Sequence, residues 1–173
     1  MKRLKLIFCL LCLCCSLTEA KEVQVDAQKE VDEMTGRLVA SYLEAKVDED
    51  VIAGYATALR SDGSFADLDY ITVHEGSFYP AGSDLKRLKS MAIAYRKPAN
   101  KYYNSGRLLK QIVAGIDYWY RVRPKSGNWW FGDIGAPQDY MVPLILLKGK
   151  ISDKKLLHYS SYLQDLTGNK GHK

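Results

Sequence analysis

The chain has 173 residues and a formal net charge of +5 at pH 7, and 47% of its residues are hydrophobic. This length suits one domain with a substantial core. The small excess of positive charge is too weak to indicate a nucleic-acid-binding protein.

Residues 1–20 have the pattern of a signal peptide. Three cations near the start precede an apolar run over residues 6–15, and Thr18 and Ala20 are small enough to flank a cleavage site. The apolar run is too short to span a membrane as a stable helix. We therefore expect a secreted or periplasmic protein whose mature domain covers residues 21–173.

All cysteines of the chain lie inside this leader, at Cys9, Cys12, Cys14 and Cys15. The mature part therefore has no disulfide and no thiolate metal site. A lipoprotein anchor at Cys14 or Cys15 is the alternative interpretation, but Leu13 and Cys14 are not the small residues that usually precede such an anchor.

Apolar residues recur at helical spacing along the mature part, whereas strand-like alternation is nearly absent. The pattern predicts a first helix from residue 27 to about residue 45 and a second helix capped by Asp48. An Asp-Gly turn follows within Ser61–Tyr70, and an irregular loop continues to Gly82.

Two further helices are predicted after this loop. Ser83 caps the third helix and Pro98 ends it, while Asn104 or Ser105 begins the fourth. Their predicted inward-facing residues are Leu85, Leu88, Met91, Ala92 and Tyr95 in the third helix, and Leu108, Leu109, Ile112, Ile116 and Trp119 in the fourth.

The last two helices follow a tryptophan-containing loop. Pro137 can occupy the first position of the fifth helix, and Pro143 is expected to kink that helix or delay its start. Ser152 caps the sixth. Helical hairpins joined by loops of uneven length predict an all-α fold, namely an incomplete α/α toroid or a solenoid layer.

The segment SGNWWFGDIGAP (Ser126–Pro137) places two adjacent tryptophans in the predicted loop. Neighbouring side chains point to opposite faces of an extended segment and diverge by about 100° in a helix, so Trp129 and Trp130 cannot both fill one core pocket. Either one of them is a core residue and the other covers a hairpin, or at least one is a flat platform for a sugar ring.

The polar residues around the tryptophans suit a sugar ligand. Asn128 carries both a donor and an acceptor for sugar hydroxyls. Arg121, Arg123 and Lys125 can pair with carboxylates or sulfates. The predicted partner is an acidic polysaccharide, and no residues indicate a metal site.

The segment GNWWFGDIGAP resembles the Asn-Trp-Trp-x-x-Glu-Ile-Gly-x-Pro signature of the polysaccharide lyases of family 8, the chondroitin, hyaluronate and xanthan lyases. Upstream segments resemble the family's matching stretches in the same order, namely DGSFADLDY (Asp62–Tyr70), LKRLKSMAIAYRKPANKYY (Leu85–Tyr103) and IVAGIDYWY (Ile112–Tyr120). This chain departs from the family at Asp133, where Glu is usual, and at Pro143.

The resemblance implies an N-terminal α/α toroid followed by β-sheet domains, and cleavage of acidic polysaccharides by β-elimination without a metal or organic cofactor. In the family, an Asn binds the uronate carboxylate while a Tyr, assisted by His and Arg, transfers the proton. Asn128, Trp129 and Trp130 match the substrate-binding patch. Asn169 has flanks that do not fit the catalytic Asn, so no catalytic residue is assigned.

We therefore expect a truncated N-terminal, substrate-binding part of a polysaccharide lyase that acts on glycosaminoglycans such as chondroitin or hyaluronan in carbohydrate catabolism. The catalytic residues and the C-terminal domains of the full enzyme are expected outside these 173 residues. The alternative is a stand-alone secreted helical protein that binds carbohydrate or acts as a scaffold.

Overall fold

The computed structural model describes residues 27–73 and 79–167, and within it the chain divides into two compact units, Met1–Ser41 and Tyr42–Lys173. The predicted signal peptide lies outside the described residues, so it stays a prediction. None of the described helices is both long and apolar enough to cross a membrane.

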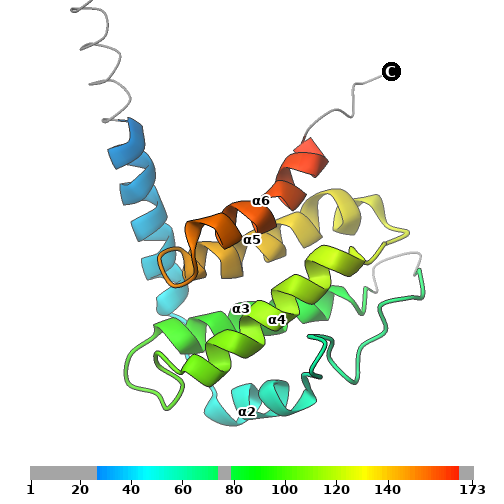
Figure 1. Ribbon diagram of the computed structural model, residues 1–173, viewed down its shortest axis with the longest axis horizontal. Coiled ribbons are helices and arrows are strands. Elements are labelled where there is room, and N and C mark those ends of the chain that lie inside the picture. Colours follow the sequence, from blue (N-terminus) through cyan, green and yellow to red (C-terminus); the bar gives the residue numbers. More distant parts are fainter. Residues whose placement is uncertain (1–26, 74–78, 168–173) are drawn as a thin grey trace, which may run out of the picture. The chain divides into compact units, whose positions relative to one another are not determined.

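Regular structure in the described residues is helical, apart from one isolated antiparallel bridge between Leu59 and Phe65. Residues 27–43 form a first helix, which confirms the helix predicted there. The elements that follow are α2 (Glu49–Ala58), α3 (Gly82–Arg96), α4 (Gly106–Val122), the π-helix η1 (Phe131–Gly135), α5 (Ala136–Leu147) and α6 (Asp153–Thr167) (Figure 1). The all-α prediction is confirmed.

Side-chain caps explain where three of these helices begin. Asp48, Ser105 and Ser152 each accept a hydrogen bond from a backbone N–H in the first turn that follows, at 3.1, 3.3 and 3.4 Å. The caps at Asp48 and Ser152 were predicted, and Ser105 is one of the two residues predicted to begin its helix. The predicted cap at Ser83 is wrong, because α3 begins at Gly82 and its first N–H groups already donate to carbonyls of the preceding turn.

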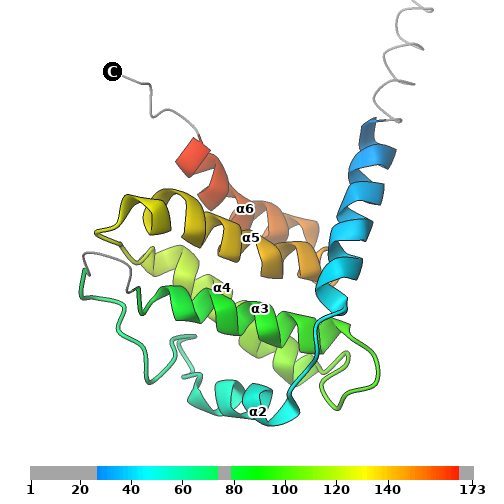
Figure 2. The ribbon, with the colours of Figure 1, turned by 180° about the vertical axis from the view of Figure 1, so that it is seen from behind.

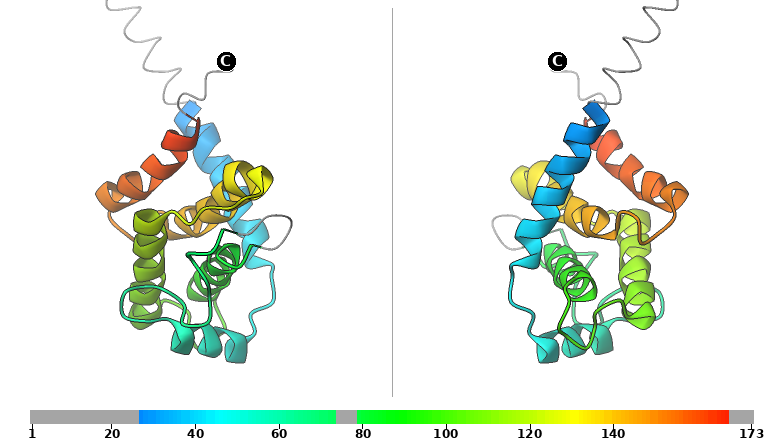
Figure 3. Two further views of the ribbon diagram at one scale, coloured as in Figure 1. Left: turned by 90° about the vertical axis from the view of Figure 1, so that its right-hand side faces the viewer. Right: turned by 90° about the vertical axis from the view of Figure 1, so that its left-hand side faces the viewer.

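Helix α3 is the central helix of the second unit. Its residues 91–95 are all buried. Successive helical residues differ by about 100°, so five in a row cover the whole circumference and require neighbours on every side. Helices α2, α4 and α5 supply these neighbours, as Figures 2 and 3 show.

Helices α3 and α5 begin at the same end of the unit. Near the opposite end, Nη1 of Arg96 donates to the carbonyl of Leu146 at 2.6 Å, which ties the C-terminal part of α3 to that of α5. The two helices therefore run in the same direction, with their positive dipole ends side by side.

Helices α4 and α6 pack against each other beside this pair. Gly115 lets α4 approach α3 closely, because a Cβ there would lie 2.5 Å from a methyl carbon of Leu88. Tyr159 of α6 donates its hydroxyl to Asp117 of α4 at 2.5 Å. Trp119 is fully buried, as predicted.

The predicted Asp-Gly turn is present before the long loop. The Asp62 carboxylate accepts hydrogen bonds from the backbone N–H and the hydroxyl of Ser64 at 2.9 and 2.7 Å, and these bonds hold its pKa below the usual range. Gly63 has φ of +92°, and a Cβ there would lie 2.0 Å from the carbonyl oxygen of Ala114. The turn therefore needs glycine at this position.

Side chains of α3 hold the loop that follows. Asp84 is fully buried, and its Oδ2 accepts the Tyr70 hydroxyl at 2.6 Å, while the Tyr70 oxygen accepts the backbone N–H of Phe65 at 2.9 Å. Arg87 forms a bidentate ion pair with Asp67, in which both N···O distances are 2.7 Å. Two contacts one helical turn apart thus fix the loop to α3.

Burial raises the pKa of Asp84 to about 7, and the hydrogen bond from Tyr70 only partly offsets this. Oδ1 of Asp84 has no hydrogen-bond partner among the described residues. The buried ionised carboxylate therefore costs stability at neutral pH.

We expect Asp84→Asn to become more stable relative to the parent chain as the pH rises. The folded state holds the Asp84 proton more tightly than the unfolded chain between about pH 4 and about pH 7, so the parent loses stability across this window. At about 1.4 kcal/mol per pKa unit, the relative gain is a few kcal/mol. Denaturant unfolding of both proteins across the window measures it, and parallel stability profiles would contradict the expectation.

Candidate functional site

A cavity of about 400 Å³ lies where α3 and the helical segment leading into α5 begin. Cavities of this size commonly hold small ligands, with apolar walls and a few polar groups. Its lining residues are Tyr79, Gly82, Ser83, Lys86, Trp130, Phe131, Gly135, Ala136, Gln138 and Asp139. Aromatic side chains and polar side chains therefore both face the cavity.

The tryptophans lie in a helical turn rather than in the predicted loop. Helical structure begins at Trp129 and continues through η1 into α5. Asn128 starts this segment, because its Oδ1 accepts the backbone N–H of Trp130 at 2.9 Å. The Asn128 oxygen, which the sequence analysis assigned to sugar hydroxyls, thus caps a helix in this structure.

The π-helix η1 separates the tryptophans from the regular turns of α5. The N–H of Ala136 bonds to the carbonyl of Phe131, five residues back. Pro137 has no N–H, and in a regular α-helix its ring would clash with the carbonyl four residues earlier, so the wider π turn gives it room. Pro143 lies inside α5 and does not delay its start.

Trp130 forms one wall of the cavity. Its ring lies across Gly135, where a Cβ would be 2.8 Å from the ring atom Cζ3. It also meets Phe131 edge-on, with ring centroids 5.2 Å apart. These two contacts hold the ring in place, although the side chain remains 44% exposed and is therefore not part of the core.

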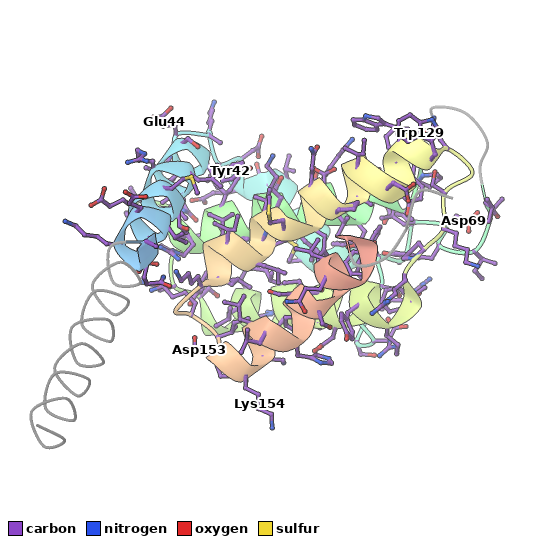
Figure 4. All side chains as sticks on the ribbon, turned by 90° about the horizontal axis from the view of Figure 1, so that it is seen from above. Tyr42, Glu44, Asp69, Trp129, Asp153 and Lys154 are labelled. Atoms are coloured by element: carbon purple, nitrogen blue, oxygen red, sulfur yellow. The ribbon has the colours of Figure 1, made fainter. Side chains whose placement is uncertain are left out.

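Trp129 is 69% exposed and does not line the cavity. Figure 4 shows it on the surface at the start of the helical segment, at the same end of the unit as Asp69 and at the other end from Asp153 and Lys154. So much exposed indole surface is costly in water, which favours a role in contacting a ligand.

Tyr79 also lines the cavity. Its hydroxyl donates to the carbonyl of Pro124 at 2.9 Å, and its ring centroid lies 5.8 Å from that of Phe131. Gly82 makes room for the ring, because a Cβ there would be 2.9 Å from Cδ1 of Tyr79. Burial raises the pKa of Tyr79, so the phenol stays neutral at physiological pH.

The N-terminal alpha-helical domain of polysaccharide lyase family 8 matches residues 43–173 of this chain. The chain belongs to this family. The match begins within two residues of the start of the second compact unit, Tyr42–Lys173. The fold and the family expected from the sequence are therefore confirmed.

Two curated lyases of this family resemble the chain. Chondroitinase-AC of Pedobacter heparinus is 33% identical over 102 residues, which cover 58% of this chain and 14% of that enzyme. Hyaluronate lyase HylB of Enterococcus faecalis is 32% identical over 88 residues, which cover 46% of this chain and 9% of that enzyme.

A solved structure of chondroitinase AC lyase, from a study of its complexes with oligosaccharides, matches with a TM-score of 0.67 and 27% identity. The match covers 79% of this chain and 20% of the solved chain. The family 8 chain thus spans a small part of the length of these relatives.

The three cations predicted for the substrate-binding patch do not line this cavity. The Arg121 guanidinium lies 5.4 Å from the ring centroid of Tyr118, and Arg123 lies 5.2 Å from those of Tyr120 and Tyr162. Lys125 is exposed. Of the predicted site residues, Trp130 lines the cavity, whereas Arg121, Arg123, Lys125, Asn128 and Trp129 do not.

Lys86 of α3 lines the cavity instead, together with Ser83, Gln138 and Asp139. In the sequence, Lys86 is one of several charged residues on a helix and carries no local signal of a site. Only the packing of α3 beside the helical segment of the tryptophans brings it to the cavity that Trp130 also lines. No group of three or more His, Cys, Asp or Glu side chains within the described ranges could hold a metal ion.

We expect Gly135→Ala to move the Trp130 ring without lowering stability. The added methyl would overlap the far edge of a half-exposed ring that can shift, and alanine favours helix over glycine by up to about 1 kcal/mol. Near-ultraviolet circular dichroism should change while the melting temperature is maintained or rises. Gly132→Ala is the matched control, because a Cβ there meets nothing within 4 Å. Identical aromatic spectra for both variants would contradict this role of Gly135.

Proposed function

We propose that this family 8 chain holds an acidic polysaccharide of the glycosaminoglycan type in the cavity beside Trp130. The observation that carries the proposal is the cavity itself, whose aromatic walls come from Tyr79, Trp130 and Phe131. Flat aromatic rings stack on the apolar CH face of a sugar and leave its hydroxyls free. Ser83 and Gln138 supply donors and acceptors for those hydroxyls.

The exposed ring of Trp129 extends the proposed binding surface beyond the cavity. A polysaccharide continues past any single pocket, so a second platform one residue away gives the next sugar a surface to contact. The exposure of Trp129, at 69%, supports this assignment. Asn128 contributes by capping the helical turn that presents both rings.

We further propose that the chain is the substrate-holding part of an enzyme that acts by β-elimination. The curated relatives are a chondroitinase and a hyaluronate lyase, and the solved relative was studied with bound oligosaccharides. The chain spans at most a fifth of these proteins. The resemblance leaves the Asn, His, Tyr and Arg of the proton-transfer set unassigned in this sequence. The proposal places the chemistry outside these 173 residues.

The location proposed for this binding is outside the cytoplasm. Residues 1–20 combine cations, a short apolar run and small residues in the order typical of a signal peptide. A protein that binds long polysaccharides encounters them outside the cell or in the periplasm, which is consistent with export of the chain.

Trp130→Ala should weaken binding of hyaluronan or chondroitin oligosaccharides about tenfold and leave the helices intact. Stacking on an aromatic ring is worth about 1–3 kcal/mol for a nucleic-acid base, and about 1.4 kcal/mol corresponds to a factor of ten. Calorimetric titration measures the affinity, and circular dichroism measures the fold. Trp119→Ala is the contrasting variant, because it removes a fully buried ring and should cost about 3–5 kcal/mol of stability. Unfolding by Trp130→Ala to the same extent would refute the platform role.

The purified chain should bind these oligosaccharides without cleaving them. Elimination forms an unsaturated uronate that absorbs ultraviolet light, so the absorbance of chondroitin sulfate or hyaluronan solutions is expected to stay constant. The reason is that the proposal places the proton-transfer residues of the family outside these 173 residues. A steady rise in absorbance proportional to protein concentration would show that catalytic residues are present after all.

A further inference from the structure

Lys86 is the only cation among the described residues that line the cavity. It lies on the second turn of α3 and is exposed, so it can reach a ligand without a change in the fold. Its ammonium group has no ion-pair or hydrogen-bond partner among the described residues, in contrast to Arg87, the next residue, which is paired with Asp67.

The α5 side of the cavity carries the opposite charge. Asp139, in the first turn of α5, also lines the cavity, and no ion pair joins it to Lys86. An anionic ligand group is attracted to the α3 side and repelled from the α5 side, while Asp139 can accept a hydrogen bond from a sugar hydroxyl. The cavity therefore has a positive charge on its α3 side and a negative charge on its α5 side. A sugar with one negatively charged edge is expected to bind with that edge toward α3.

The neighbouring backbone adds to this preference. Gly82 and Ser83, the first two residues of α3, line the cavity beside Lys86, at the positive end of the helix dipole. By itself a helix start does not make a site. Here the start of α3 lies next to the exposed ammonium group of Lys86. The helix dipole and the ammonium charge therefore both favour a negative charge at the α3 side of the cavity.

We propose that Lys86 is a specificity-determining residue that pairs with an anionic group, carboxylate or sulfate, of the sugar held against Trp130. This inference rests on the proposed polysaccharide binding and adds the residue that selects acidic over neutral sugars. It assigns this role to a residue that lies outside the tryptophan segment and that the sequence analysis did not select.

The test compares Lys86→Gln with the parent chain, using three defined oligosaccharides as probes. Hyaluronan oligosaccharides carry carboxylates only, carboxyl-reduced chondroitin sulfate carries sulfates only, and carboxyl-reduced hyaluronan is neutral. Lys86→Gln should lose about tenfold in affinity for at least one of the two anionic probes, because a charge-assisted hydrogen bond is lost, and should bind the neutral probe like the parent. The anionic probe that is affected identifies the group that Lys86 binds.

Two further variants separate a charge effect from a change in folding. Lys86→Arg keeps the charge and should retain most of the affinity for the same anionic probe. Lys110→Gln removes an equal charge from an exposed position on α4 that does not line the cavity, and should bind all three probes like the parent.

Three results would overturn the inference, and they differ from one another. Unchanged binding of both anionic probes by Lys86→Gln, with weaker binding by Trp130→Ala, would leave the proposed function standing and remove Lys86 from it. An equal loss for the neutral probe would show that Lys86 acts by packing. Failure of the parent to bind any probe would remove both the proposed function and the role of Lys86.

Discussion

The enclosure of helix α3 is the constraint on which the rest of this unit depends. Residues 91–95 are buried around the whole helix, so α3 can be stable only with α2, α4 and α5 packed against it. Because α3 and α5 run in the same direction, their first turns meet at one end of the unit. The cavity lies at that meeting point, so the packing of the core determines where the cavity forms.

The two adjacent tryptophans lie in different surroundings. Trp130 is seated across Gly135 and beside Phe131, which fixes the orientation of a half-exposed ring. Trp129 projects to the surface. The tryptophan that packs in the hydrophobic core of the unit is Trp119, which is fully buried. The π-helix helps to seat the Trp130 ring on Gly135. Its wider turn brings residues five apart onto one face, and Trp130 and Gly135 have this spacing.

The long loop before α3 is held by interactions of unequal cost. The ion pair of Arg87 with Asp67 is partly exposed and therefore contributes little net stability. The buried contact of Asp84 with Tyr70 is more demanding, because a desolvated carboxylate is favourable only when it is protonated or fully hydrogen-bonded. After the loop, Tyr79 reaches Pro124 and becomes a wall of the cavity. The loop thus links the core helix to the site.

Local chemistry determined much of this protein from the sequence alone. Asp48, Ser105 and Ser152 satisfy the N–H groups of the turn that follows each of them, so helix starts could be predicted without knowledge of packing. The order of apolar residues predicted the buried faces of α3 and α4, and the Asn-Trp-Trp segment predicted the family.

Only the tertiary structure decided how these elements form a site. The Asn128 cap begins a helical turn at the tryptophans, and a π turn continues it into α5, so residues expected in a loop lie in a helix. Arg121 and Arg123, close to the tryptophans in sequence, lie over tyrosine rings, whereas Lys86, far from them in sequence, lines the same cavity as Trp130. Caps depend on residues within one turn and can be read locally, but a cavity depends on the direction in which separate helices pack.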